Sequence, residues 1–109
     1  MSAASRRKGL TGEREVAQRF TEAGWHVRGL ESGGDQLCVH VAAIERRETA
    51  PTTLLHIEVK RQERLRLPEW LEQARNQAPE GVPPVVCFRQ SRGEWYAVLT
   101  LDDLLRLVG

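Results

Sequence analysis

The sequence predicts one α/β domain in which a mixed β-sheet is flanked by helices, in the order α-β-β-β-α-β-β-α. Three observations lead to this fold class: a helical period near the N-terminus, five short runs typical of strands, and two later helix-start signals. A chain of 109 residues with 40% hydrophobic and 28% charged residues has the size and composition of one globular domain. We therefore expect residues 1–109 to form a single domain, within which residues 1–8 are a flexible basic N-terminal arm.

The first half of the chain is expected to contain one helix and three strands. Apolar residues recur on one stripe over 10–24, where Gly24 is a stop signal for the helix. Strands are expected at 25–30 and 36–44, on either side of the Gly-rich turn at 31–35. The polar segment that follows reads as an exposed hairpin loop, and it leads to an alternating strand at 54–61.

The second half is expected to contain a helix, a hairpin and a last helix. Pro68 suits the first turn of a helix over 68–78. Strand-like runs at 84–90 and 94–100 enclose a turn and indicate a hairpin. The T-x-x-D spacing that begins at Thr100 is a capping box, which predicts a short helix to the end of the chain.

Several protein classes are disfavoured by composition. No apolar run approaches the roughly 20 residues that span a bilayer, and the basic N-terminus is not followed by the apolar segment of a secretory signal. We expect a cytoplasmic protein of a prokaryote or of a phage in its host. The two cysteines, Cys38 and Cys87, lack zinc-ligand spacing and are expected to be buried reduced thiols.

The charge pattern is local rather than global, because the net charge is only +1. Two basic clusters, which a DNA-binding protein would use to neutralise phosphates, include Arg6, Arg7, Lys8, Arg61 and Arg64. A solvated surface with balanced charges explains these clusters equally well. The chain strongly prefers Arg to Lys and Glu to Asp, so its few lysines and aspartates draw attention to their positions.

The strand expected at 54–61 carries a chemical signal. Side chains alternate along a strand, so Ile57 and Val59 point to the core while Glu58 and Lys60 project from the other face, about 6.7 Å apart. A divalent metal held by Glu58 could share an attacking water with the ammonium group of Lys60. The E-V-K motif alone is weak, because a half-exposed strand with a polar face produces the same pattern.

Two more carboxylates strengthen this interpretation. Asp35 follows two glycines and precedes a strand, so with Glu58 it could form a hard oxygen site for Mg²⁺, although an Asp beside glycines is also a common turn former. Glu13 lies on the apolar stripe of the first helix, where a carboxylate is costly unless it is paired or binds metal. The alternative is that Glu13 stays hydrated and stabilises the helix dipole. Glu15, in contrast, is expected to pair with Arg19 on the outer face.

Taken together, these segments resemble the PD-(D/E)xK nucleases of the restriction-endonuclease-like fold, and within them the archaeal-type Holliday-junction resolvases. The motifs that carry the resemblance are K-G-x-x-x-E-R-E at 8–15, a Gly-rich turn that ends in Asp35, and E-V-K at 58–60. The resemblance is close over 7–61 and covers the rest mainly by element order. The sequence departs from the family in its longer loop at 45–53 and in Gly34, where a proline is usual.

The resemblance implies a role for each motif residue. Asp35 and Glu58 would be the inner ligands of Mg²⁺, for which Mn²⁺ would substitute, with the main-chain carbonyl of Val59 and the carboxylate of Glu13 completing the shell. Lys60 would orient the attacking water. Three further residues are implied to contact the DNA backbone: Arg14, Arg28 and Ser32.

The function expected on this basis is resolution of four-way DNA junctions by paired symmetric nicks, which would serve DNA recombination and repair. Such paired cleavage favours a homodimer, with Trp70, Leu71, Trp95 and the C-terminal helix as candidate contacts, although core packing is an equal alternative for most of them. The competing interpretations are a general or restriction-type DNA nuclease, a non-catalytic DNA-binding domain of the same fold, and a generic interaction module.

Overall fold

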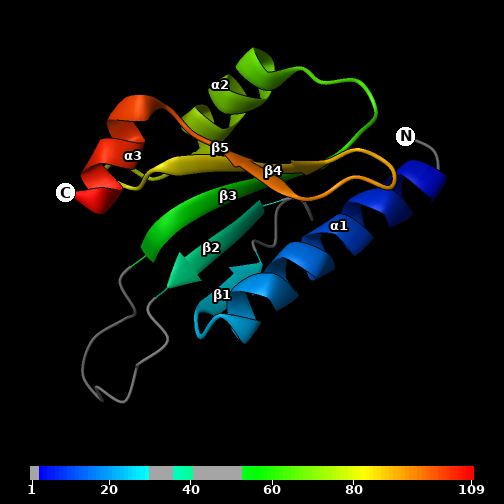
Figure 1. The fold of residues 1–109 in the computed structure, drawn as a ribbon, viewed down its shortest axis with the longest axis horizontal. Helices are drawn as coiled ribbons and strands as arrows, with labels where there is room; N and C mark the ends of the chain where they lie inside the picture. The colour runs from blue at the N-terminus through cyan, green and yellow to red at the C-terminus, as the bar shows by residue number, and fades with distance from the viewer. Residues whose placement is uncertain (1–2, 30–35, 41–52) are drawn as a thin grey trace.

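The computed structural model describes residues 3–29, 36–40 and 53–109, which form a five-stranded sheet between helices (Figure 1). The elements are α1 (Ala3–Glu22), β1 (His26–Gly29), β2 (Gln36–His40), β3 (Thr53–Arg61), α2 (Leu67–Gln77), β4 (Pro84–Arg89), β5 (Tyr96–Val98) and α3 (Leu101–Val108). Their order is the predicted α-β-β-β-α-β-β-α. The predicted fold class is therefore confirmed, with element ends that differ by a few residues.

The sheet is mixed, and its strands are arranged in chain order from β1 to β5. The pairs β1–β2, β2–β3 and β4–β5 are antiparallel, whereas β3 and β4 are parallel and are joined through α2. This order makes β3 the central strand, with a hydrogen-bonded neighbour on each side. At the start of β2, Gln36 is the register partner of Glu58.

The two faces of the sheet bury separate hydrophobic clusters. On the first face, α1 contributes Val16 to a cluster with Ile57, Val59, Val85 and Cys87. On the second face, α2 contributes two residues to a cluster with residues of β4: Trp70, Ala74, Val86 and Phe88. The alternation of β3 and β4 therefore separates an α1 face from an α2 face, and this division determines where each polar side chain of β3 lies.

The first helix is longer than the sequence predicted. It starts at Ala3 rather than at residue 10, so residues 3–8, which were expected to form a separate arm, continue α1. Its end agrees with the prediction, because Gly24 has a positive φ of 97° and its N–H donates to the carbonyl of Thr21. The N–H of Trp25 donates to the carbonyl of Phe20, which completes a Schellman motif.

A glycine lets α1 approach the sheet closely. A Cβ atom on Gly12 would lie 3.3 Å from the ring of Trp95 and 3.5 Å from the side chains of both Val59 and Arg61. Glycine normally weakens a helix interior, and this contact explains why one is present. The helix therefore crosses β3 at the level of the E-V-K motif, and the next residue along α1 is Glu13.

The C-terminal helix packs less completely than the other two. Thr100 caps α3 as predicted, because its hydroxyl oxygen accepts a hydrogen bond from the backbone N–H of Asp103 at 3.2 Å. All of the large apolar residues of α3 are nevertheless exposed: Leu101, Leu104, Leu105, Leu107 and Val108. Among the helices of the described segments, none is both long enough and apolar enough to cross a membrane.

Candidate active site

Glu58 and Lys60 form an ion pair on the α2 face of the central strand. The Lys60 ammonium nitrogen lies 3.3 Å from Oε1 of Glu58, and the exposed fractions of the two side chains are 11% and 0%. On β4, the register partner of Glu58 is Val86 and that of Lys60 is Phe88. Both partners belong to the hydrophobic cluster that α2 covers. The polar face of β3 is therefore buried rather than half-exposed, because α2 covers it.

His56 lies on this same face, two residues before Glu58. Its side chain is fully buried, and neither ring nitrogen forms a hydrogen bond with any part of the protein that the structure describes. Burial lowers the pKa of the imidazole below its ordinary value, because charging a desolvated ring is unfavourable. His56 is therefore a neutral neighbour of the Glu58–Lys60 pair.

Glu13 is brought to the level of this pair by the close crossing at Gly12. Its side chain is partly buried, and its Oε2 atom is buried from solvent. This burial agrees with the inference that Glu13 is not a simple hydrated helix-start residue. However, α1 covers the opposite face of β3 from the one that Glu58 and Lys60 occupy, so the described residues do not bring Glu13 and Glu58 to the same side of the strand.

Asp35 and Ser32 fall outside the described residues, so their predicted roles stay predictions. The residue that follows Asp35 in the chain, Gln36, pairs in register with Glu58 at the first position of β2. Of the four predicted catalytic residues, the structure thus joins Glu58 to Lys60 and places Glu13 on the helix that covers the other face of β3. In the part of the chain that is described, no three His, Cys, Asp or Glu side chains gather closely enough to hold a metal ion.

The predicted DNA-binding residues are spread over several elements. Arg14 on α1, Arg28 on the edge strand β1 and Arg64 after β3 are exposed, and Arg61 is half-buried at the end of β3. The remaining basic residues of this set lie within the first half of α1: Arg6, Arg7 and Lys8. Exposed arginines are suitable for contacts with phosphates.

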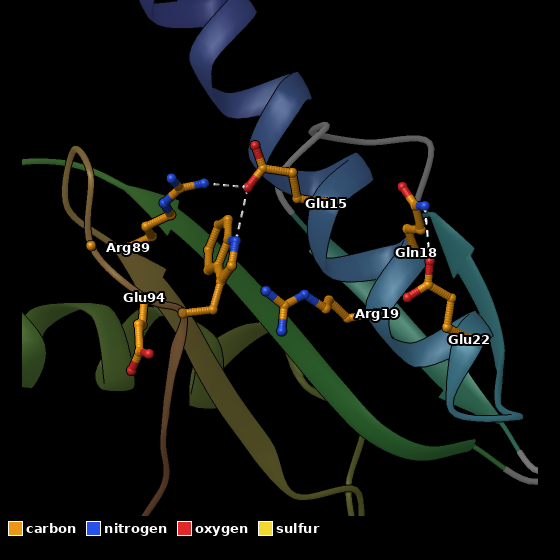
Figure 2. Close-up of a pocket in the computed structure, with 8 residues that line it drawn as sticks. Glu15, Gln18, Arg19, Glu22, Arg89 and Glu94 are labelled. Carbon is orange, nitrogen blue, oxygen red and sulfur yellow. Dashed lines mark hydrogen bonds and ion pairs between the residues drawn. The ribbon is translucent and has the colours of Figure 1, made fainter.

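The sequence analysis predicts that Glu15 pairs with Arg19. In the structure, Glu15 faces the sheet instead. Its Oε2 atom accepts hydrogen bonds from the Arg89 guanidinium and from the indole N–H of Trp95, each at 2.8 Å (Figure 2). Burial raises the pKa of Glu15, but these hydrogen bonds and the charges of Arg89 and Arg61 lower it by more. The net result is a pKa below the ordinary value of 4.5.

This network contains residues that sequence reasoning missed. Arg89 lies 74 positions after Glu15, and nothing in a local pattern connects the two. Gly12 did carry a signal, because a glycine inside a helical pattern indicates a close backbone approach.

The expectation of dimer contacts is corrected for Trp70, which is 4% exposed in the α2 cluster; Leu71 and Trp95 pack partly against the two clusters.

Comparison with known proteins identifies a family for this arrangement. A family model described as "Phage putative PDDEXK endonuclease" matches residues 4–108. Searches of the curated proteins and of the solved structures found no match. The match agrees with the E-V-K strand and the α-β-β-β-α-β-β-α order, and it identifies the PD-(D/E)xK superfamily rather than the resolvase type within it. Since it covers almost the whole chain, the protein belongs to this family of phage PDDEXK endonucleases.

Proposed function

We propose that the protein is a metal-dependent endodeoxyribonuclease that cuts four-way DNA junctions, acting in the cytoplasm of a bacterium that the phage infects. The observation that carries the proposal is the contact between Glu58 and Lys60 on a central strand that α1 and α2 cover on its two faces. A fully buried carboxylate and a largely buried ammonium group are each costly to desolvate. Their presence on a strand that could hold apolar residues favours a chemical role.

The residues available suit a hard divalent cation. Glu58 supplies a buried carboxylate on the α2 face of β3, and Glu13 supplies a partly buried one from α1 on the opposite face. Carboxylate oxygen atoms are the preferred ligands of Mg²⁺ and Mn²⁺. Asp35 and the main-chain carbonyl of Val59 complete the proposed set. When bound, the cation lowers the pKa of a coordinated water and offsets charge on the phosphate.

The protein side chains then position and polarise the reacting groups. Lys60 would donate a hydrogen bond to the attacking water or to a non-bridging phosphate oxygen, and Glu58 keeps the ammonium group in place at 3.3 Å. Attack of the water oxygen on phosphorus breaks the bond to the 3′ oxygen. The water oxygen becomes part of the 5′-phosphate and gives up a proton to solvent, and the departing 3′ oxygen takes up a proton from solvent to become the 3′-hydroxyl.

Four-way junctions are the proposed substrate because the basic and acidic residues of α1 follow the resolvase pattern K-G-x-x-x-E-R-E. Arg14 on α1 and Arg28 on β1 are exposed and would hold phosphates of the DNA backbone. Symmetric nicks require two copies of the site, so a homodimer is part of the proposal. The exposed apolar residues of α3 give a surface that a second copy could cover.

Cleavage of a synthetic four-way junction tests the catalytic part of the proposal. The wild-type protein should cut in Mg²⁺ or Mn²⁺ and not in EDTA, and Glu58→Gln should reduce the rate by at least about a hundredfold, the size of effect seen when one transition-state contact is removed. Glu72→Gln, on the exposed side of α2, is the matched control and should cut normally. Absence of cleavage by the wild-type protein in either metal would overturn the proposal.

A panel of substrates tests the junction preference separately. Junction, flap and linear duplex should be compared at equal protein and metal concentrations, and the junction should be cut at least about tenfold faster, a difference of about 1.4 kcal/mol. Equal rates on all three would identify a general nuclease. Binding of DNA that neither metal nor Asp35→Asn changes, without any cleavage, would identify a non-catalytic DNA-binding domain.

A further inference from the structure

Two arginines lie side by side where the parallel strands β3 and β4 end. Arg61 is the last residue of β3 and Arg89 the last residue of β4, and the two are register partners. Each lies two positions after a residue of the cluster on the α1 face, Val59 or Cys87, so both side chains belong to that face. The carboxyl ends of parallel strands are a common position for ligands in α/β sheets.

Arg89 is held in place by the Glu15 network. Its Nη1 atom donates a hydrogen bond to Oε2 of Glu15 at 2.8 Å, and the indole N–H of Trp95 donates to the same oxygen (Figure 2). The Arg89 side chain is 26% exposed and lines a pocket beside α1. The guanidinium group therefore has a defined orientation and can still be reached from solvent.

Arg61 is half-buried and has no bonded partner among the described residues. Its Cβ atom would lie 3.5 Å from a Cβ atom on Gly12, which places it next to α1. Within the described segments it forms neither a hydrogen bond nor an ion pair, and its Nε atom is buried. The charges of Arg61 and Arg89 both act on Glu15, the one described carboxylate that forms an ion pair with either arginine. Two guanidinium groups thus share one carboxylate, and a bound anion would balance the second positive charge.

The segments that follow the two strands are tied together. The side-chain amide of Gln90 donates a hydrogen bond to the main-chain carbonyl of Glu63 at 2.6 Å, and the N–H of Ser91 donates to the Glu63 carboxylate at 2.8 Å. These bonds hold the ends of β3 and β4 in one arrangement, so the two arginines keep their spacing before a ligand binds. A preorganised site of this kind loses less entropy on binding.

We propose that Arg61 and Arg89 together bind a phosphate of the DNA backbone. Arginine suits such a contact, because its planar set of N–H donors matches the oxygen atoms of a phosphate. This phosphate is not the one that is cut, because Lys60 and Arg61 project from opposite faces of β3. The inference rests on the proposed function, since it takes DNA as the ligand, and it adds Arg89 to the residues that the sequence predicts to contact DNA.

The salt dependence of DNA binding tests this site without cleavage. A labelled four-way junction is titrated with protein in EDTA at several NaCl concentrations, and binding is followed by fluorescence anisotropy. Each phosphate contact contributes about 0.9 to the slope of log K against log salt concentration. Arg61→Gln and Arg89→Gln should each weaken binding, and the double variant should lower the slope by about 1 in total, because one phosphate contact is lost.

Exposed arginines on other elements are the matched controls. Arg75→Gln on α2 and Arg106→Gln on α3 remove the same charge far from the ends of β3 and β4, and they should leave the slope unchanged. A slope that falls by about 2 in the double variant would mean two separate phosphate contacts and would overturn the shared site. An equal fall in the control variants would overturn it as well, since the effect would then come from net charge alone.

Glu15→Gln separates phosphate binding from a structural role of Arg89. This variant and Arg89→Gln both remove the ion pair between the two residues, so an ion pair that only supports the fold predicts that both weaken DNA binding alike. At a phosphate site, Glu15→Gln removes a carboxylate that competes with the phosphate, while the amide oxygen can still accept from Arg89 and Trp95. The affinity of Glu15→Gln for DNA should therefore rise. Weaker binding, equal to that of Arg89→Gln, would overturn the proposal.

Further results distinguish this site from the proposed function. Inorganic phosphate at low millimolar concentration and constant ionic strength should not displace the junction, because a free ion lacks the neighbouring backbone contacts; displacement would overturn the assignment to DNA. An unchanged salt slope in the double variant overturns the site, even if the wild-type protein cuts junctions. A lowered slope, with a wild-type protein that cuts nothing in Mg²⁺ or Mn²⁺, would support the site and refute the nuclease.

Discussion

The ammonium nitrogen of Lys60 lies 3.3 Å from Oε1 of Glu58, and the glutamate side chain is completely inaccessible to solvent. Breaking a buried ion pair by removing one partner leaves an uncompensated charge. We therefore expect Lys60→Met to lower the free energy of unfolding by about 3 kcal/mol. Glu58→Gln combined with Lys60→Met should recover at least about 1 kcal/mol of this loss, because the orphaned charge is gone. Urea denaturation of the four proteins measures the coupling, and strictly additive effects would contradict it.

The close crossing of α1 over β3 predicts that position 12 accepts only a very small side chain. Gly12→Leu would force its side chain against Trp95 and Val59, and overpacking of this kind costs about 1–3 kcal/mol. Thr11→Leu is the control, since Thr11 is exposed one residue earlier on the same helix. Thermal unfolding should show a clear loss for the first variant only. Equal melting temperatures would mean that the contact with Trp95 is not tight.

The lowered pKa of Glu15 predicts a defined pH dependence of stability. Between the ordinary pKa of 4.5 and the lower folded value, the unfolded chain binds a proton that the folded protein does not. The contribution of Glu15 is therefore complete above the ordinary pKa and is lost as the pH falls through the folded pKa. The stability difference between the wild-type protein and Glu15→Gln, about 1 kcal/mol at neutral pH, should shrink below pH 4.5. A difference that stays constant on acidification would refute the network.

The burial of Cys87 predicts that its thiol reacts slowly in the native protein. Cys87 is buried, and burial raises its pKa to about 12, so the thiolate that reacts with alkylating reagents is scarce at neutral pH. In a Cys38→Ser background, iodoacetamide should modify Cys87 slowly in the native protein and rapidly in urea. The rates are followed by mass spectrometry. The ratio of the rate in urea to the rate in the native protein should fall when a destabilising substitution such as Gly12→Leu is added, because modification of the native protein becomes faster. Rapid native modification would show that the thiol is accessible.

Much of the fold could be predicted because local signals and packing agree. The alternation of β3 placed Ile57 and Val59 in the core and Glu58 with Lys60 on the other face, as observed. Gly24 and Thr100 ended and started helices where the sequence indicated, because backbone geometry at such positions depends on a few neighbouring residues.

The partners of the polar side chains could not be predicted in the same way. The helical spacing offers Glu15 a partner in Arg19. In the folded protein, the Glu15 carboxylate accepts hydrogen bonds from Arg89 and Trp95 instead, and these residues are distant in the sequence. Burial of Glu58 depends on α2 covering the second face, which alternation alone does not reveal. The start of α1 was missed because residues 3–9 are polar or small and carry no apolar period.

The central place of β3 has a consequence for how the protein responds to partial opening. A strand that is hydrogen-bonded on both sides and covered on both faces exchanges its amide hydrogens only when the whole domain opens. Edge segments such as β1 and α3 can fray without disturbing it. Local unfolding of these edge segments, by heat or proteolysis, would then weaken ligand binding before it disrupts the ion pair between Glu58 and Lys60.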